Sequence, residues 1–265
     1  MRIAIIGAGN MGGAIARGLS VGSKVNTKDI ICSNPSNLKL EKLKEEFPDL
    51  SVTNDNEKAV KGVDVVILAV KPWLIEGVIN QIKGSLDFSK QYIVSIAAGV
   101  TFEQLLNYFD AEQNMLRPIL FQVIPNTAIA MMSSVTFISS ENATEDQANE
   151  IVALFNELGF TLLIEEKMMG AGTALASCGI AFALRYIRAA TEGGVEMGFT
   201  SKQASDIVAH TVKGAADLLI TNNSSAEDEI DKVTTPGGIT IKGLNEMEHA
   251  NFTSAVIKGL KAAHK

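Results

Sequence analysis

The sequence has few of the residues that build disulfide frameworks and metal sites. It contains two cysteines and three histidines among 265 residues. Cys32 and Cys178 lie far apart, and neither stands in a CxxC or a Cys/His pattern. A disulfide scaffold or a structural zinc site would need more such residues at closer spacing. We therefore expect two reduced thiols, no metal ion and a cytoplasmic protein.

An excess of positive charge is also missing. The chain has 23 Lys and Arg residues against 30 Asp and Glu residues, which gives a formal net charge of −7. A general nucleic-acid-binding protein needs a basic face to neutralise phosphates. The composition therefore predicts no nucleic-acid partner.

Long hydrophobic runs are scarce. The most apolar segment, Gly170–Leu184, is shorter than the roughly 20 residues of a membrane span and is rich in Gly and Ala. The first residues, MRIAIIGAGN, reach glycines where the apolar part of a signal peptide would continue. We expect no signal peptide and no membrane partner, and we interpret Gly170–Leu184 as a buried helix or a subunit-interface helix.

The first 165 residues alternate between short apolar runs and amphipathic stretches. This alternation predicts a mostly parallel sheet with helices on both faces. Thr144–Gly159 is a helix candidate with a threonine N-cap, a glutamine three residues later and a glycine stop. The predicted strands are Ile3–Gly7, Asp29–Ser33, Val63–Val70, Tyr92–Ala98, Pro118–Ile124, Ser134–Ser139 and Phe160–Glu165.

Strand patterns stop after Lys167. We expect an α/β protein with a Rossmann-type doubly wound domain at residues 1–165 and an all-α domain at residues 166–265. Small residues recur along the first predicted helix of the second domain, where a neighbouring helix could approach closely, and an apolar seam of this kind predicts at least a dimer. These small residues are Gly172, Ala176, Gly179 and Ala183. The predicted helices are Met168–Gly198, Ser201–Thr221 and Ile239–Lys265.

Gly7, Gly9 and Gly12 have the GxGxxG spacing, directly after a predicted strand and before a predicted helix. Glycines at these positions permit a tight turn and let backbone N–H groups approach a pyrophosphate. The pattern therefore predicts a dinucleotide-binding site.

The residue that recognises the adenosine ribose is expected at the end of the second strand, where NAD-preferring sites carry Asp or Glu. This chain has Cys32, Ser33 and Asn34 there, and Asp29 precedes the strand. Because no carboxylate would repel a 2′-phosphate and Ser33 and Asn34 carry donors, we expect NADP(H) to be preferred and NAD(H) to be possible.

Three further loops follow predicted strands at their carboxyl ends, where open α/β sheets bind ligands. They are Ala69–Trp73, Ser95–Val100 and Val123–Ala128. A fourth unusual segment, VTTPGGITIKGL (Val233–Leu244), interrupts the helical pattern of the second domain. A helical bundle does not need such a segment, and the residues alone leave two interpretations open: a helix–helix connector with capping threonines, or an anion site in which N–H groups at a helix start are flanked by hydroxyls.

These motifs together resemble the pyrroline-5-carboxylate reductase family over essentially the whole chain. The resemblance rests on GAGNMGGAI, AVKP, SIAAGV, PNT, ALASCGIAF and, most specifically, VTTPGGITIKGL. It implies NAD(P)H-dependent reduction of 1-pyrroline-5-carboxylate to L-proline, the last step of proline biosynthesis. It also implies a helical domain that dimerises and an active site between the two domains.

The resemblance also assigns roles to residues. The substrate carboxylate is expected at Thr235, Gly238, Ile239 and Thr240, and Thr240 is the candidate catalytic residue that contacts the imine nitrogen. The expected cofactor contacts are Gly7, Gly9, Asn10, Met11, Ser33, Asn34, Asn56, Ala69, Val70, Lys71, Pro72, Ala97 and Asn126.

The chain departs from the family pattern at Cys178 and Ile180, where a serine and a proline are usual. Two alternatives remain open at this point. One is another NADP-linked imine or hydroxyacid reductase with the same two domains. The other is a dimer that senses a dinucleotide without turnover.

Overall fold

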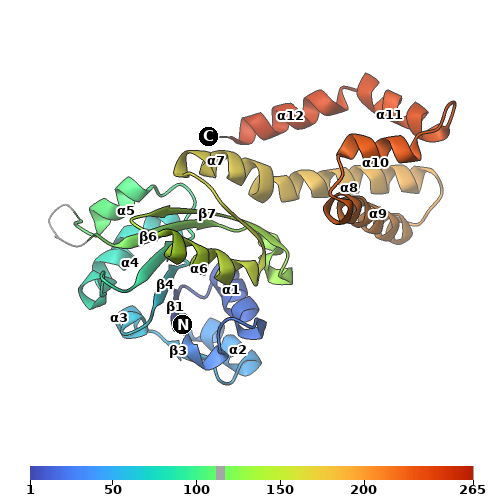
Figure 1. The fold of residues 1–265 in the computed structure, drawn as a ribbon. Helices are drawn as coiled ribbons and strands as arrows, with labels where there is room; N and C mark the ends of the chain where they lie inside the picture. Colours follow the sequence, from blue (N-terminus) through green and yellow to red (C-terminus); the bar gives the residue numbers. More distant parts are fainter. Residues whose placement is uncertain (112–116, 265) are drawn as a thin grey trace. The chain divides into compact units, whose positions relative to one another are not determined.

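The computed structural model describes residues 1–111 and 117–264. The chain divides into two compact units, Met1–Ser177 and Cys178–Lys265 (Figure 1). We call them the sheet unit and the helical unit, and describe each separately.

The sheet unit is built on an eight-stranded sheet in the order β3-β2-β1-β4-β5-β6-β7-β8. Neighbouring strands are parallel except β6 and β7, which are antiparallel. The strands are β1 (Ile3–Ile6), β2 (Ile30–Ser33), β3 (Ser51–Thr53), β4 (Val65–Leu68), β5 (Tyr92–Ser95), β6 (Ile119–Ile124), β7 (Ser134–Glu141) and β8 (Gly159–Leu163).

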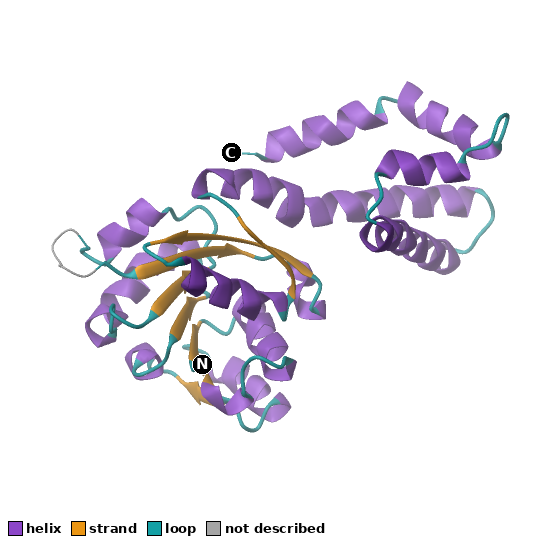
Figure 2. Ribbon diagram, in the orientation of Figure 1, coloured by secondary structure: helices purple, strands orange, loops and turns teal. Residues whose placement is uncertain are grey.

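Helices cover both faces of this sheet (Figure 2). Ile3 and Ile5 of β1 pack into one buried cluster with α1, α2 and α6, whereas Ala4 and Ile6 pack into another with α3, α4 and α5. Strands buried on both faces are apolar throughout, which explains the continuous runs in the sequence. The α-helices are α1 (Asn10–Val21), α2 (Asn37–Glu46), α3 (Asn56–Val60), α4 (Ile75–Ile82), α5 (Phe102–Tyr108), α6 (Glu145–Asn156) and α7 (Met169–Gly172).

Short helical segments complete the sheet unit. Five are 3-10 turns, and the sixth, η6, is a π-helical segment that ends at Cys178, the first residue of the helical unit. They are η1 (Thr27–Asp29), η2 (Pro72–Leu74), η3 (Lys83–Ser85), η4 (Thr127–Met131), η5 (Glu166–Met168) and η6 (Thr173–Cys178).

The helical unit holds α8 (Gly179–Glu196), α9 (Ser201–Asn222), α10 (Ala226–Val233), α11 (Ile239–His249) and α12 (Phe252–Ala263). Capping boxes start α9 at Thr200 and α10 at Ser225. Helix α8 meets α9 closely, because a Cβ on Gly194 would lie 2.8 Å from the Cβ of Ala204. Among the described residues of this unit, Gly194 and Ala204 are the buried ones.

The helical run Glu166–Glu196 has 31 residues and a mean hydropathy of 1.3 in its most apolar window, so by length and composition it would be able to cross a membrane. Only 17% of that window is buried within the chain. The run therefore carries an apolar surface that its own chain leaves largely open.

The seven predicted strands are confirmed, with their ends shifted by up to three residues. Strand β3 was not predicted, since SVT has no apolar run and forms a strand through pairing with β2. The capping box at Thr144 and Gln147 is confirmed, but α6 ends at Asn156 and Gly159 begins β8. The last predicted helical segment, Ile239–Lys265, includes Lys265, which lies outside the described residues.

The predicted small-residue seam is wrong at Gly172, which packs against its own chain. A Cβ at this glycine would lie 2.8 Å from the Phe137 ring of β7, so the close approach is made by the sheet of the same chain. Gly179 differs, because a Cβ there would meet no atom within 4 Å among the described residues.

Candidate cofactor and substrate sites

The loop between β1 and α1 is packed so closely that its first and third glycines admit no side chain. Gly7 has φ +106° and donates its N–H to the Ser33 carbonyl oxygen at 2.7 Å. A Cβ on Gly7 would lie 2.5 Å from the Ala69 carbonyl oxygen, and one on Gly12 would overlap the Gly7 carbonyl oxygen. These contacts fix the loop against the end of β4.

Gly9 has a different role, because a Cβ there would meet open space. It is the N-cap of α1, has no side chain to cap the helix, and is followed by no acidic residue in the first turn. The first N–H groups of α1, at Asn10 and Met11, are therefore left for an anion. This cradle fits the pyrophosphate of a nicotinamide dinucleotide.

At the end of β2, the side chains of Ser33 and Asn34 turn inward. Ser33 is fully buried and donates its hydroxyl to Oδ1 of Asn56 at 2.6 Å. Asn34 accepts the Ala8 N–H at Oδ1 (3.0 Å) and donates Nδ2 to the Ser36 carbonyl oxygen (3.2 Å). The structure thus brings three predicted cofactor contacts together, and the Ser33 hydroxyl and one N–H of each of the two amides already have protein partners. Asp29 lies in η1, before the amino end of β2.

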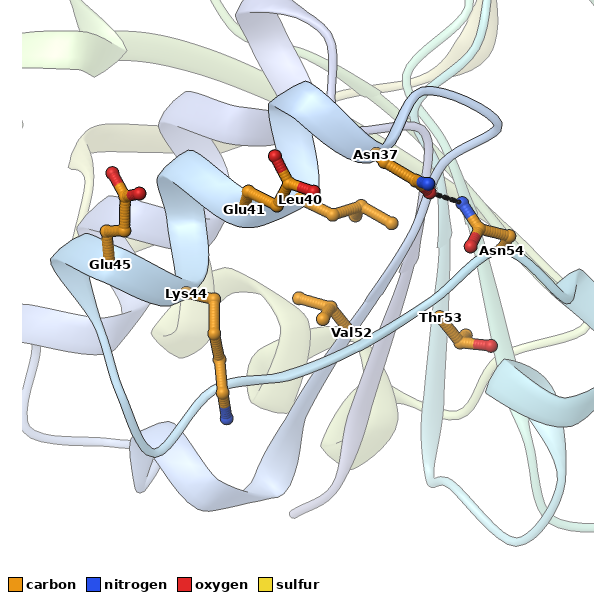
Figure 3. Close-up of a pocket in the computed structure, with 8 residues that line it drawn as sticks. All are labelled: Asn37, Leu40, Glu41, Lys44, Glu45, Val52, Thr53 and Asn54. Carbon is orange, nitrogen blue, oxygen red and sulfur yellow. Dashed lines mark hydrogen bonds between the residues drawn. The ribbon is translucent and has the colours of Figure 1, made fainter.

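A pocket of about 380 Å³ lies beside this corner, between α2 and β3 (Figure 3). Asn54 borders it, donating Nδ2 to Oδ1 of Asn37 and to the Asn34 carbonyl oxygen, both at 2.8 Å. None of the predicted cofactor contacts lines it, so it belongs to the sheet edge. Its lining residues are Asn37, Leu40, Glu41, Lys44, Glu45, Val52, Thr53 and Asn54.

The other predicted cofactor contacts lie in loops at the carboxyl ends of β4, β5 and β6. After β4, Ala69 donates its N–H to the Ile6 carbonyl oxygen at 2.8 Å, and Val70, Lys71 and Pro72 follow at the start of η2. After β5 comes Ala97, which is buried. After β6 comes Asn126, which accepts the Ala128 N–H at 3.0 Å. These residues share one edge of the sheet with the glycine loop.

A buried polar contact behind the β5 loop was missed in the sequence. Gln122 on β6 donates Nε2 to the Val100 carbonyl oxygen (2.9 Å) and to Oε1 of Glu166 (2.7 Å). The same carboxylate oxygen accepts the Phe102 N–H at the start of α5 (2.8 Å). A glutamine inside an apolar strand was the available signal, since a buried amide needs partners. The contact holds the Ser95–Val100 loop in place.

The segment Thr235–Gly238 forms a turn that ends at a helix start. Gly238 donates its N–H to the Thr235 carbonyl oxygen at 2.9 Å, and Gly237 has φ +71°. Proline followed by a glycine with positive φ matches a type II turn. Gly238 is the N-cap of α11 and offers no side-chain cap.

Nothing in the described parts of the chain caps the N–H groups of the first turn of α11, and the Thr240 hydroxyl has no hydrogen-bond partner there. The neighbouring Thr234 instead donates its hydroxyl backward, to the Ile230 carbonyl oxygen at 3.1 Å. Ile239 is 87% exposed. The predicted substrate contacts therefore gather on one loop with free donors, as a carboxylate site requires.

The titratable groups offer no other centre of chemistry. Burial raises the pKa of the Cys32 thiol to about 12, so this cysteine stays protonated and inert. Across residues 1–111 and 117–264, no three His, Cys, Asp or Glu side chains gather as a metal site.

Two family models match this chain, and they match different parts of it. Residues 166–265 match a model described as pyrroline-5-carboxylate reductase dimerisation. Residues 2–99 match a model described as NADP oxidoreductase, coenzyme F420-dependent.

Two curated relatives come from Dictyostelium discoideum. Pyrroline-5-carboxylate reductase 1 is 38% identical over 97% of this chain, which spans only 48% of that protein's length. Pyrroline-5-carboxylate reductase 2 is 35% identical, with 97% of this chain and 89% of that protein covered.

Solved structures give the same result. A pyrroline-5-carboxylate reductase from Coxiella burnetii has a TM-score of 0.92 and 28% identity, with 99% of this chain and 95% of that chain covered. The Plasmodium falciparum pyrroline carboxylate reductase with NADP bound has a TM-score of 0.84 and 25% identity, with the same coverage.

Proposed function

The chain belongs to the pyrroline-5-carboxylate reductase family, and on that premise we propose that it reduces 1-pyrroline-5-carboxylate to L-proline with NAD(P)H, the last step of proline biosynthesis. The cofactor supplies the hydride for the carbon of the C=N bond. The protein's own residues bind and orient the two reactants, and this positioning is the larger part of their contribution.

For the cofactor, Gly7 and Gly12 hold the loop at its close approach to β4, and the first N–H groups of α1 bind the pyrophosphate. Loops after β4, β5 and β6 bind the nicotinamide side, and the corner of Ser33, Asn34 and Asn56 binds the adenosine ribose. The family match over residues 2–99 supports this assignment.

NADP(H) is the preferred cofactor and NAD(H) is also used. No Asp or Glu ends β2, so no carboxylate repels a 2′-phosphate. The Ser33 hydroxyl and one N–H of the Asn34 amide have partners within the protein, however, and Asn34 is only 7% exposed, so a more exposed group recognises the phosphate.

The substrate carboxylate binds at the turn before α11, where the N–H groups of the residues that follow Gly238 have no side-chain cap. This turn is the observation that carries the proposal. At the starts of α9 and α10, by contrast, the side chains of Thr200 and Ser225 cap the first N–H groups. The hydroxyls of Thr235 and Thr240 add donors beside the same anion.

Thr240 contacts the ring nitrogen of the imine. A threonine hydroxyl is too weak an acid to protonate the imine by itself, so the residue orients the nitrogen and relays a proton from solvent. Its hydroxyl is available for this task, because it has no hydrogen-bond partner in the described residues.

The protein acts as a homo-oligomer, at least a dimer, in the cytoplasm, without a membrane or nucleic-acid partner. The dimerisation model covers residues 166–265, and the helices there expose large apolar side chains such as Ile220 and Phe252. A second copy of the chain would cover the open surface of Glu166–Glu196.

The test is an NADPH-consumption assay with pyrroline-5-carboxylate, run beside a panel of β-hydroxyacids with NADP⁺. We expect turnover with the imine and none with the hydroxyacids. Turnover with a hydroxyacid alone would identify a different reductase with the same fold, and NADPH binding without any turnover would identify a dinucleotide sensor.

A further inference from the structure

The adenosine corner leaves open which group recognises the 2′-substituent of the cofactor. The hydroxyl of Ser33 is buried and donates to Asn56, and the amide of Asn34 is used by Ala8 and Ser36. The Ser33 hydroxyl has no proton left to offer a phosphate, and Asn34, whose Nδ2 keeps one further N–H, is only 7% exposed. An exposed donor has to come from a residue beyond the end of β2.

The orientation of the Asn56 amide follows from Ser33. A buried hydroxyl needs an acceptor for its proton, and Oδ1 of Asn56, at 2.6 Å, is its partner. The Asn56 Nδ2 group is therefore turned away from Ser33, and it donates to Oε1 of Gln81 at 2.8 Å. Ser33, Asn56 and Gln81 thus form a row of hydrogen bonds in which each residue donates to the next, from the core to the surface.

Gln81 is the last residue in this row of hydrogen bonds. It lies near the end of α4 and is exposed. Because its Oε1 is held by Asn56, its NH₂ group points away from Asn56 with both protons free. One further N–H of Asn56 is also free. These are neutral donors next to residues expected to contact the ribose.

We propose that Gln81 is the specificity-determining residue of the adenosine corner: its side-chain NH₂ group, anchored by Asn56, donates to the 2′-phosphate of NADP(H). The inference rests on the proposed function only in taking a nicotinamide dinucleotide as the ligand. A neutral amide holds a phosphate less strongly than an arginine fork does, so the site also accepts the 2′-hydroxyl of NAD(H).

The decisive variant is Gln81→Glu. Glutamate keeps an oxygen to accept the Asn56 N–H and replaces the NH₂ donor by a carboxylate oxygen of the same shape. Losing a hydrogen bond to a charged group corresponds to roughly a 10- to 150-fold loss in affinity. We expect a loss of this size for NADP⁺ and a change of no more than about threefold for NAD⁺, since the 2′-hydroxyl can donate to the carboxylate.

Binding is measured without substrate, by the quenching of the single tryptophan. Trp73 is 76% exposed and directly follows the cofactor-loop residues Lys71 and Pro72. Titrations with NADP⁺ and NAD⁺ give both dissociation constants for each variant. The ratio of kcat/KM with NADPH and NADH gives a second readout of the same preference.

Asn80→Asp is the matched control. Asn80 neighbours Gln81 on α4 and is exposed, and its side chain has no hydrogen bond to another described residue. The same amide-to-carboxylate change there adds the same charge without touching Asn56. We expect NADP⁺ affinity to change by less than about threefold, because a solvated charge acts weakly at a distance.

A selective loss of NADP⁺ affinity in Gln81→Glu, absent in Asn80→Asp, supports the proposal. Equal losses in both variants would mean that general charge repulsion acts, and equal losses for both cofactors in Gln81→Glu would mean that the residue supports only the shared ribose. Either result, or unchanged binding, overturns the proposal. A wild type that binds NADP⁺ selectively but does not reduce pyrroline-5-carboxylate would overturn the proposed function and leave this inference standing.

Discussion

The two units of this chain solve the burial of apolar side chains in opposite ways. In the sheet unit, apolar strands are covered on both faces, and residues such as Ile5, Ile67 and Phe121 are fully buried. In the described part of the helical unit, only Gly194 and Ala204 are buried, while Ile220 remains 80% exposed. Both units nevertheless contain helices that start with capping boxes, and both contain many apolar residues.

The difference shows that helix signals and core formation are separate properties. Capping boxes start α9 and α10, and an apolar periodicity runs through α8 to α12, but neither feature encloses these helices. A domain with so much apolar surface needs a partner, and the match to a dimerisation family indicates a second copy. We therefore expect the sheet unit to be stable by its own packing and the helical unit to depend on association.

The largest effect that tests this contrast is Phe121→Ala in the sheet unit. Removing a fully buried aromatic ring costs about 3–5 kcal/mol in the free energy of unfolding. We expect this loss in urea denaturation at every protein concentration. The control, Ile220→Ala in the helical unit, should destabilise only through association, so its effect should fade on dilution. A concentration-independent loss of similar size at Ile220 would break the contrast.

Thr240→Ala tests whether the helical unit carries the substrate site. Loss of one hydrogen bond to a charged substrate predicts a roughly 10- to 150-fold decrease in kcat/KM for the imine. A proton-relay role adds a decrease in kcat. NADPH affinity, measured by titration, should stay unchanged, because the predicted cofactor contacts lie on the sheet unit.

The matched variant is Thr234→Ala, whose hydroxyl bonds the Ile230 carbonyl oxygen at the end of α10. It should lower stability by a cap's contribution, about 0.5–2 kcal/mol, with little change in kcat/KM. Wild-type kinetics in Thr240→Ala would show that the substrate site lies elsewhere.

Gly179→Leu separates contacts within the chain from contacts between chains. A Cβ at Gly179 would meet no other described atom within 4 Å in the single chain, whereas a Cβ at Gly172 would meet the Phe137 ring. We expect Gly179→Leu to weaken dimerisation by about 1–3 kcal/mol, the cost of overpacking a close contact. Gly172→Leu should instead destabilise the sheet unit. Analytical ultracentrifugation and thermal unfolding distinguish these outcomes, and an undisturbed Gly179→Leu dimer would remove this glycine from the interface.

The smallest expected effect is a pH dependence at the start of α10. Lys232 first, then Ser224 and Asn222, hydrogen-bond the Glu229 carboxylate and lower its pKa to about 2. A lowered pKa means that this stabilisation is present above the ordinary value of 4.5 and is lost as the pH falls through about 2. Amide protection factors around residues 222–232, corrected for the intrinsic pH dependence of exchange, should therefore fall below pH 4.5 in wild type. A Glu229→Gln variant should show a smaller fall there; an equal fall would assign the effect to other carboxylates.

The sequence by itself determined what depends on neighbouring residues. Continuous apolar runs predicted seven strands, because a strand covered on both faces has no polar alternation. Thr144 and Gln147 predicted a capping box, and Pro236 followed by Gly237 predicted a turn before a helix, since both patterns act within a few residues. The family resemblance likewise rested on such short motifs, and the comparisons confirmed it.

Tertiary structure alone decided what depends on residues distant in the chain. The sequence alone suggested that the Ser33 hydroxyl was available to a cofactor. In the fold, this hydroxyl donates a hydrogen bond to Asn56, 23 residues away. Asn56 in turn meets Gln81, 25 residues further on, and Gln122 meets Glu166 across 44 residues. Periodicity fixes which face of an element is apolar, but hydrogen-bond partners are chosen when separate elements come together. The glycine loop was therefore predictable from the sequence, whereas the hydrogen bonds that join Ser33, Asn56 and Gln81 were not.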